Sequence, residues 1–91
     1  MYRITDYTKQ KAKELNVNVK PSKNKNKKID VYKNNKIIAS VGAKGYYDYP
    51  NYIIKNGLEY ADKKRNLYKI RHRNDRKIKN SNGYYADRLL W

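Results

Sequence analysis

The sequence predicts one small α+β domain in which helices pack on an antiparallel β-hairpin or three-stranded sheet. The first observation is length, since 91 residues provide a single hydrophobic core and leave no room for a separate catalytic domain. The second is the alternation of apolar and polar residues on both sides of Asn34-Asn35, which is typical of a hairpin. The third is a set of segments that carry helix caps or helical periodicity. We therefore expect one domain over residues 1–91, with an N-terminal helix, a long basic helix and a short C-terminal helix.

The N-terminal helix is expected to be capped at Thr5-Asp6 and to run to about Leu15. A threonine hydroxyl accepts hydrogen bonds from free backbone N–H groups, and an aspartate is favourable near the positive end of a helix. Val17 and Val19 then alternate with asparagines and predict a short strand. Residues 20–28 are rich in lysine and asparagine without any periodicity, which predicts a mobile basic loop.

A hairpin is predicted with strands at about 28–33 and 36–41. Asn34-Asn35 separates the strands, and asparagine tolerates the positive φ angles that a tight hairpin turn requires. The glycines that follow at 42 and 45 end the second strand, after which Pro50 favours a short helical turn.

The long helix is expected to begin near Gly57 or Leu58 and to continue to about Arg76, because no glycine or proline interrupts this segment. A helical wheel places Tyr60, Leu67 and Ile70 on one face, which predicts the buried side. The opposite, outer face then carries four cations in a stripe, namely Arg65, Lys69, Arg73 and Arg76.

The C-terminal helix is expected to be capped by Ser81 or Asn82 and to end in a cluster of apolar residues. Leu89, Leu90 and Trp91 either fold back into the core or contact a partner. We expect the first, because only 17 of the 91 residues are leucine, isoleucine or valine and the core needs both leucines.

Basic residues are concentrated in two segments. The chain has 23 lysines and arginines against eight acidic residues, giving a net charge of +15. Residues 20–36 contribute +6 and residues 63–79 contribute +8, so the rest of the chain is nearly neutral. Blocks of a single sign create a field that attracts phosphates, and they predict a nucleic-acid partner, DNA in preference to RNA. Solvated faces of a generic basic protein are the competing interpretation.

The predicted nucleic-acid-binding residues come from both segments. Arginine and lysine both suit phosphate, and arginine adds bidentate geometry. The candidates in the long helix and after it are Arg65, Lys69, Arg71, Arg73, Arg76 and Lys77, and those in the loop are Lys23, Lys25, Lys27 and Lys28.

Tyrosine is the main aromatic residue of the chain, with 11 copies and no phenylalanine. Four tyrosines lie between 46 and 52, and a ring next to cations can stack on an unpaired base. Tyr47 and Tyr49 are the candidates for stacking. The competing and favoured interpretation is that this cluster packs in the core.

No catalytic, metal or cofactor site is expected. His72 is the only histidine, and Asp75 three residues later can orient it, yet no nucleophile or third ligand accompanies the pair. The chain has no cysteine, and no apolar run is long enough for a membrane span or a signal peptide. We therefore expect a protein that is not an enzyme and is not secreted.

The C-terminal third resembles small basic proteins of unknown function from nucleocytoplasmic large DNA viruses. The residues that carry the resemblance are Tyr68, Arg71-His72, Asp75, Gly83-Tyr84-Tyr85-Ala86 and Leu89-Leu90-Trp91. The resemblance implies a viral protein found in the virion or in the infected host cell. It assigns no activity, so no site residue is transferred.

These observations favour a non-enzymatic viral protein that binds or condenses DNA without reading its sequence. The alternative is a minor capsid or cement protein whose basic surface meets acidic virion proteins or further copies of itself, with tyrosines and Trp91 at the interface. A small nuclease is disfavoured because no reactive group accompanies His72.

Overall fold

The computed structural model describes residues 2–91 and shows an α+β fold, as the sequence predicts. Strands β1 (Asn18–Pro21), β2 (Lys27–Lys33) and β3 (Lys36–Ala43) form an antiparallel sheet in the order β1-β2-β3. The helices are α1 (Asp6–Glu14), α2 (Tyr49–Asn56), α3 (Leu58–Arg71) and α4 (Asn82–Leu90), with a short 3-10 helix, η1 (Asp75–Lys77), between the last two.

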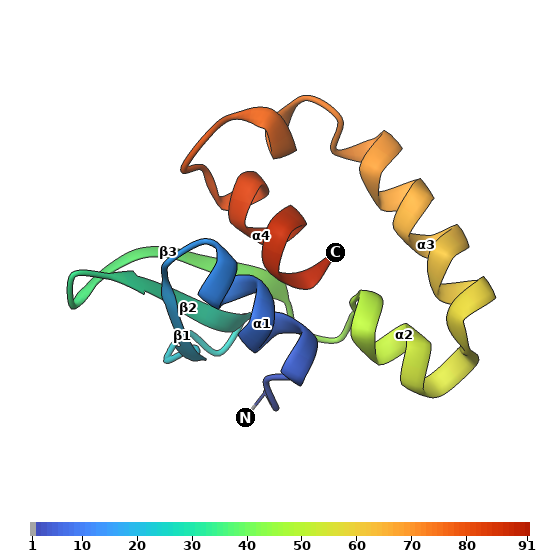
Figure 1. Cartoon of the computed structure of the whole chain (residues 1–91), viewed down its shortest axis with the longest axis horizontal. Helices are drawn as coiled ribbons and strands as arrows, with labels where there is room; N and C mark the ends of the chain where they lie inside the picture. Colours follow the sequence, from blue (N-terminus) through green and yellow to red (C-terminus); the bar gives the residue numbers. More distant parts are fainter. Residues whose placement is uncertain (1) are drawn as a thin grey trace.

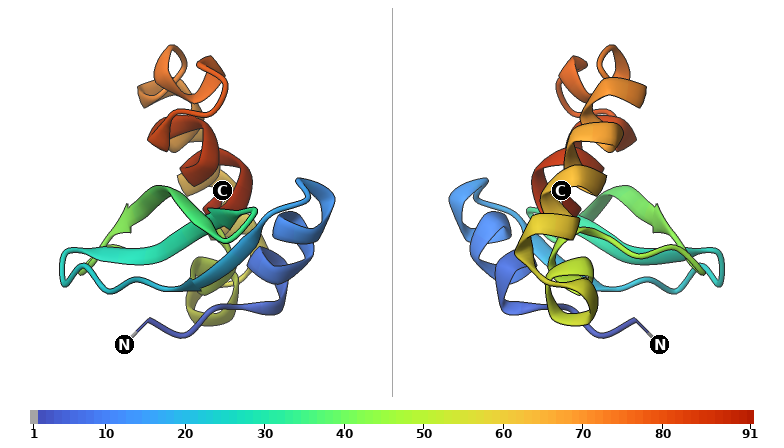
Figure 2. Two further views of the ribbon diagram at one scale, coloured as in Figure 1. Left: turned by 90° about the vertical axis from the view of Figure 1, so that its left-hand side faces the viewer. Right: turned by 90° about the vertical axis from the view of Figure 1, so that its right-hand side faces the viewer.

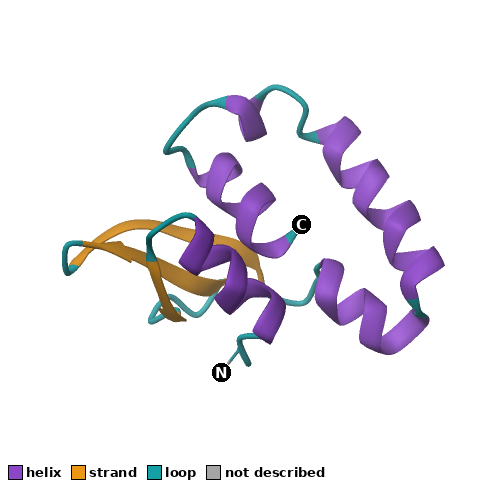
Figure 3. Ribbon diagram, in the orientation of Figure 1, coloured by secondary structure: helices purple, strands orange, loops and turns teal. Residues whose placement is uncertain are grey.

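The elements form two parts. Helices α1 and α4 lie on the sheet and on each other, whereas α2 and α3 leave the sheet after β3 and form an arch that returns through η1 to α4 (Figures 1 and 2). Helix α4 therefore lies between the sheet and α3. Figure 3 shows the three strands at one end of the molecule and the α2–α3 arch at the other.

Both terminal helices are capped as predicted. The Thr5 side chain accepts a hydrogen bond from Thr8 N, and the Ser81 side chain accepts one from Tyr84 N. The hairpin is also confirmed, since Asn34 and Asn35 adopt φ angles of 52° and 64° between β2 and β3.

The hydrophobic core belongs entirely to the sheet, α1, α4 and the connection between α1 and β1. Ile29 and Val31 on β2 are completely buried, and Leu89 and Leu90 on α4 are 0% and 1% exposed. The remaining members of the cluster are Ala12, Val17, Ala39, Val41 and Tyr85. The leucines at the end of the chain thus close the core, which was the favoured of the two interpretations.

The predicted loop at 20–28 is shorter than expected, because both of its ends are strand and only residues 22–26 form the turn. Lys20 and Pro21 belong to β1, and Lys27 and Lys28 belong to β2. The turn between the strands is held by the buried carboxylate of Asp30, which accepts hydrogen bonds from Ser22 Oγ, Ser40 Oγ and Lys23 N. Burial alone raises the pKa of Asp30, but these hydrogen bonds outweigh burial and hold the pKa below its ordinary value.

Candidate nucleic-acid interface

Three of the eight acidic residues are buried, and most lysines and arginines have no carboxylate close by. Asp30, Asp48 and Asp87 are at most 2% exposed. Among residues 2–91, the lysines and arginines within 4.0 Å of a carboxylate are Lys28, Lys69, Arg76 and Arg88, which leaves 19 of the 23 without such a partner. The electrostatic field of the protein is therefore set by cations on its surface.

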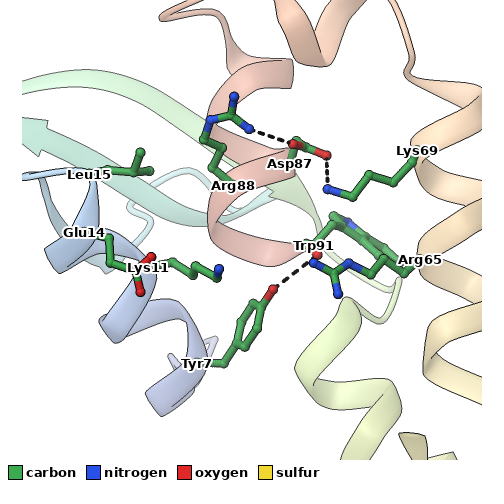
Figure 4. A pocket seen from close by; sticks show the side chains of 9 residues that line it. All are labelled: Tyr7, Lys11, Glu14, Leu15, Arg65, Lys69, Asp87, Arg88 and Trp91. Atoms are coloured by element: carbon green, nitrogen blue, oxygen red, sulfur yellow. Dashed lines mark hydrogen bonds and ion pairs between the residues drawn. The ribbon is translucent and has the colours of Figure 1, made fainter. Parts of the chain in front are cut away.

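Asp87 is the centre of an ion cluster that ties α3 and η1 to α4. Lys69 Nζ donates a hydrogen bond of 2.7 Å to Asp87 Oδ1, and Arg88 Nη1 donates one of 3.2 Å to Asp87 Oδ2 (Figure 4). Arg76 Nη1 lies 3.8 Å from Asp87 Oδ2. Asp87 is 1% exposed and pairs with both cations, so Lys69 and Arg76 contribute to the fold and are not among the cations free of a carboxylate.

Helix α3 is shorter than predicted, and the face that was predicted to be buried is exposed. It ends at Arg71, so Arg73 and Arg76 lie beyond it and the four-cation stripe does not form. Tyr60, Leu67 and Ile70 are 42%, 56% and 63% exposed, so they do not form a buried face, although Leu67 lines a hollow and Tyr60 packs on Tyr52.

The reversal has a physical cause in what α3 meets inside the molecule. The inner side of the arch meets the buried carboxylate of Asp87 and the aromatic ring of Trp91. The Arg65 guanidinium lies 4.6 Å from the centre of the Tyr49 ring, while Lys69 reaches Asp87. A long cationic side chain can pack its aliphatic stem against an aromatic ring. Its charged head group then meets the face of the ring or a carboxylate.

A hollow of about 220 Å³ lies beside this cluster, between α1, α3 and α4 (Figure 4). Its lining includes four cations, Lys11, Arg65, Lys69 and Arg88, but also the carboxylates of Glu14 and Asp87. The carboxylates oppose an anionic ligand, so this hollow is a poor phosphate site.

Arg71, Arg73 and Lys77 remain as candidate phosphate-binding residues. All three are exposed at the corner where α3 ends and η1 begins, and none has a carboxylate partner among the described residues. Lys23 and Lys25 are exposed in the turn between β1 and β2, on the sheet side of the molecule.

Lys27 and Lys28 do not belong to an exposed loop. Lys27 is half-buried in β2. Lys28 is 5% exposed, and its Nζ lies 3.3 Å from Asp48 Oδ2 and 5.5 Å from the centre of the Tyr2 ring. The prediction that Lys28 binds phosphate was therefore wrong.

The two tyrosines predicted to stack on bases have different environments. Tyr49 is 6% exposed and its hydroxyl donates a hydrogen bond of 2.7 Å to Asp62, so its ring cannot meet a base. That hydrogen bond, together with burial, raises the pKa of Tyr49. Tyr47 is 44% exposed, and its hydroxyl accepts a hydrogen bond from Lys55 Nζ.

Tyr46 belongs to the predicted tyrosine cluster but was not chosen as a stacking candidate, although at 74% exposed it is the most open ring of the four. The signal that separates it from Tyr49 is the cap of α2. Asp48 accepts a hydrogen bond from Asn51 N and Pro50 follows it, so Tyr49 enters the first turn of a helix while Tyr46 stays outside.

His72 and Asp75 are in contact on the surface, at 3.0 Å between Nδ1 and Oδ2. The hydrogen bond from His72 lowers the pKa of Asp75. The His72 ring also stacks on Tyr68 with 4.4 Å between ring centres. Within residues 2–91 no three histidine, cysteine, aspartate or glutamate side chains come together as a metal site would require.

No family model, no curated protein and no solved structure matches this chain. In the part of the chain that the structure describes, none of the helices has the length and hydrophobicity needed to cross a membrane. Functional inference therefore rests on the residues and their arrangement.

Proposed function

We propose that the protein is a non-enzymatic, sequence-nonspecific nucleic-acid-binding protein of a virus, which binds or condenses DNA by neutralising phosphates. The observation that carries this proposal is the set of 19 basic side chains without a carboxylate partner on a chain of net charge +15. Counterions around nucleic acid are released when such cations replace them, and their release drives binding.

The corner formed by Arg71, Arg73 and Lys77 is the strongest part of this surface. Two arginines offer bidentate hydrogen bonds to phosphate oxygens, and the end of a helix and a 3-10 turn fix their backbone. The turn with Lys23 and Lys25 adds charge at a second point. Contacts to phosphate carry no sequence information, so these cations fit binding without base recognition.

The salt dependence of binding tests this proposal. If about five phosphates are engaged on duplex DNA, log affinity against log salt concentration should have a slope of about −4 to −5. The slope is measured by fluorescence anisotropy between low and moderate salt. A slope shallower than about −2, or no binding at about 50 mM salt, contradicts phosphate neutralisation.

Charge-matched variants locate the interface. Changing Arg71, Arg73 and Lys77 together to glutamine should weaken DNA binding more than the control change of Lys13, Lys33 and Lys36, which are exposed elsewhere. Both variants lose the same charge and should keep their circular dichroism and melting temperature. Equal losses of affinity would mean that charge acts globally and that the corner is not an interface.

The second candidate function is a minor structural component of the virion, and the solvent face of α3 favours it. Tyr60, Leu67 and Ile70 are exposed there next to Lys63, and Ile54 on α2 is 78% exposed. Apolar residues ringed by cations suit an acidic protein partner. No DNA binding at about 50 mM salt, together with capture of an acidic virion protein that Leu67→Ser and Ile70→Ser abolish, would favour this function.

A further inference from the structure

Two adjoining hollows between the arch and the rest of the molecule share the residues Lys28, Tyr46 and Tyr47. The first hollow, of about 580 Å³, lies between α3, α4 and the end of β3, and its walls include Tyr52, Lys64, Tyr68, Arg71, His72 and Trp91. The second, of about 650 Å³, is bordered by Tyr2, Arg3, Lys44 and Asn51. We name the two hollows together the aromatic groove. No aspartate or glutamate lines either hollow, in contrast to the hollow beside Asp87.

The wall of the first hollow is a series of rings that hold one another in place. The Tyr68 ring lies between His72 and Trp91, with 4.4 Å between ring centres on each side and an angle of 8° to Trp91. The ring centres of Trp91 and Tyr52 are 6.2 Å apart. Tyr52 in turn meets Tyr47 edge to face, with 5.4 Å between ring centres. Rings fixed in this way lose little conformational entropy when a further ring stacks on them.

Tyr46 is the ring with the most open surface. It is 74% exposed, it lines both hollows, and no aromatic or cationic side chain of the described residues packs on its ring. Together with Tyr47 it forms a ridge between the two hollows. An exposed tyrosine at this place offers a face on which a planar group can stack from either side.

Cations accompany the rings along the groove. Lys64 Nζ lies 5.9 Å from the centre of the Tyr52 ring and has no carboxylate partner. Arg71 at one end, and Arg3 and Lys44 at the other, are exposed and likewise without a carboxylate within 4.0 Å. Lys28 is the exception, because Asp48 holds it. The groove therefore presents rings in its walls and free positive charge at its rims.

We propose that the aromatic groove binds unpaired nucleotides of a single-stranded nucleic acid, with bases against the Tyr46-Tyr47 ridge and phosphates at Lys64, Arg71 and Lys44. Rings beside cations complement bases beside phosphates, and each hollow has the volume of a small-ligand site. In a duplex the bases are stacked inside and cannot reach these rings. The inference rests on the proposed function and adds a strand preference to it.

The experiment compares ligands of equal charge with and without bases. A thymidine strand of about 12 nucleotides is titrated at one salt concentration against an abasic strand of the same length and against a blunt duplex. Trp91 is the only tryptophan and lies in the wall of the groove, so its fluorescence reports occupancy. We expect the thymidine strand to bind at least about fivefold more tightly than the abasic strand, and we expect only the thymidine strand to quench Trp91. A uridine strand distinguishes RNA from DNA as the source of the bases.

Variants assign the effect to the ridge. Tyr46→Ala combined with Tyr47→Ala should lower the affinity for the thymidine strand to that for the abasic strand and leave abasic binding unchanged. Tyr32→Ala, a tyrosine on β2 outside the groove, is the matched control and should retain the preference.

The outcomes separate the two proposals. If neither strand nor the duplex binds at low salt, the proposed function itself fails, and if only the duplex binds, the aromatic groove is overturned. If both strands bind equally to the unaltered protein, phosphate neutralisation stands and the aromatic groove is overturned. A loss of preference in Tyr32→Ala as large as that in the double variant also overturns the assignment.

Discussion

The two parts of the molecule are held together by different chemistry. The sheet with α1 and α4 has an aliphatic core that contains every member of the buried cluster. The arch of α2 and α3 contributes none of that cluster and is fixed to the rest by the Asp87 ions, by the Tyr68–Trp91 stack and by the contact of the Tyr49 ring with the Tyr7 ring of α1. A chain with few aliphatic residues thus forms one hydrophobic core, and aromatic contacts and ion pairs hold the remaining helices in place.

This division has a consequence for local stability. Aliphatic burial is insensitive to salt and pH, whereas the contacts of the arch depend on both. Hydrogen exchange should therefore be slowest in β2 and α4 and faster in α3, whose Lys69 and Arg65 side chains make its inward contacts. The Arg71 corner lies on this less protected part, and the aromatic groove lies where this part meets β3 and α4.

The largest effect is expected for Leu89→Ala in the core. Leu89 is completely buried between α4 and the sheet, and removing a buried leucine side chain costs about 2–5 kcal/mol of unfolding free energy. For so small a domain this is a large fraction of the total stability. Urea or thermal unfolding followed by circular dichroism measures the loss.

Leu67→Ala on the arch is the matched control. Leu67 is 56% exposed, so the same chemical change should alter unfolding free energy by less than about 0.5 kcal/mol. Similar losses at the two positions would contradict the division into an aliphatic core and an arch.

Asp87→Asn should have the next largest effect, because it leaves Lys69, Arg76 and Arg88 around a neutral amide. Removing one partner of a fully buried pair costs about 3–5 kcal/mol. Water reaches Lys69 and Arg76, whose side chains are each 27% exposed, so we expect about 2–3 kcal/mol.

Hydrogen exchange shows where the Asp87 variant loosens. Amides of α3 should exchange faster while those of β2 keep their protection, and the surface change Asp75→Asn should have a far smaller effect on both. Uniform loss of protection in β2 and α3 would mean that the arch and the sheet unfold as one unit.

Alkaline pH should weaken the arch through Tyr68. Burial, reinforced by the negative charges of Asp87 and Asp75, raises its pKa from 10.0 to about 12 in the folded protein. The contribution of Tyr68 to stability is therefore complete below pH 10 and falls by about 1.4 kcal/mol for each pH unit between the two pKa values. Unfolding in urea between neutral pH and pH 12 measures this loss.

Tyr68→Phe separates this residue from the other tyrosines whose pKa burial raises, such as Tyr7 and Tyr85. The variant should lose less stability between pH 10 and pH 12 than the unaltered protein, whereas Tyr46→Phe on the surface should not differ from it. Identical alkaline curves for all three proteins would contradict the burial of a neutral Tyr68.

The sheet part could be predicted from the sequence because its rules are local. Thr5 and Ser81 are caps with side-chain hydrogen bonds, Asn34-Asn35 adopts the expected positive φ angles, and alternation places Ile29 and Val31 in the core. The α+β class followed from these signals. The turn at 22–26 was harder, since its order depends on the distant Ser40 and on Asp30 across the sheet.

The arch was predicted poorly because the helical wheel assumes an aliphatic interior. Leu67 and Ile70 therefore seemed to define the buried face of α3, while the structure buries Ala61 and Tyr68. Arg65 and Lys69 are half-buried beside them, against a ring and a carboxylate. Asp87 is the missing information, because nothing near it in the sequence shows that a single acid collects three cations. The same contacts removed Lys69 and Arg76 from the predicted interface and left Arg71, Arg73 and Lys77.

The smallest effect is expected at Gly57, the joint between α2 and α3. Gly57 has φ 88° and ψ 166°, a region that residues with a side chain rarely adopt, at a cost of about 1–3 kcal/mol. Gly57→Ala adds a Cβ that meets no atom within 4 Å, so no packing cost adds to the strain. Alanine also loses less entropy on folding, by about 0.4–1 kcal/mol, and the net loss should be about 1 kcal/mol.

Gly42→Ala is the matched change on the sheet, and it should cost more than Gly57→Ala. Gly42 also has a positive φ of 85°, but there a Cβ would lie 2.9 Å from Leu90 Cδ1 and 2.9 Å from Lys28 Cδ. Leu90 is 1% exposed and Lys28 is held by Asp48, so neither side chain can move away without disturbing the core. Urea unfolding of the two variants compares them directly. If Gly57→Ala were the more damaging, the joint of the arch would be packed as tightly as the sheet, and the contrast between the two parts would fail at the position where it is easiest to measure.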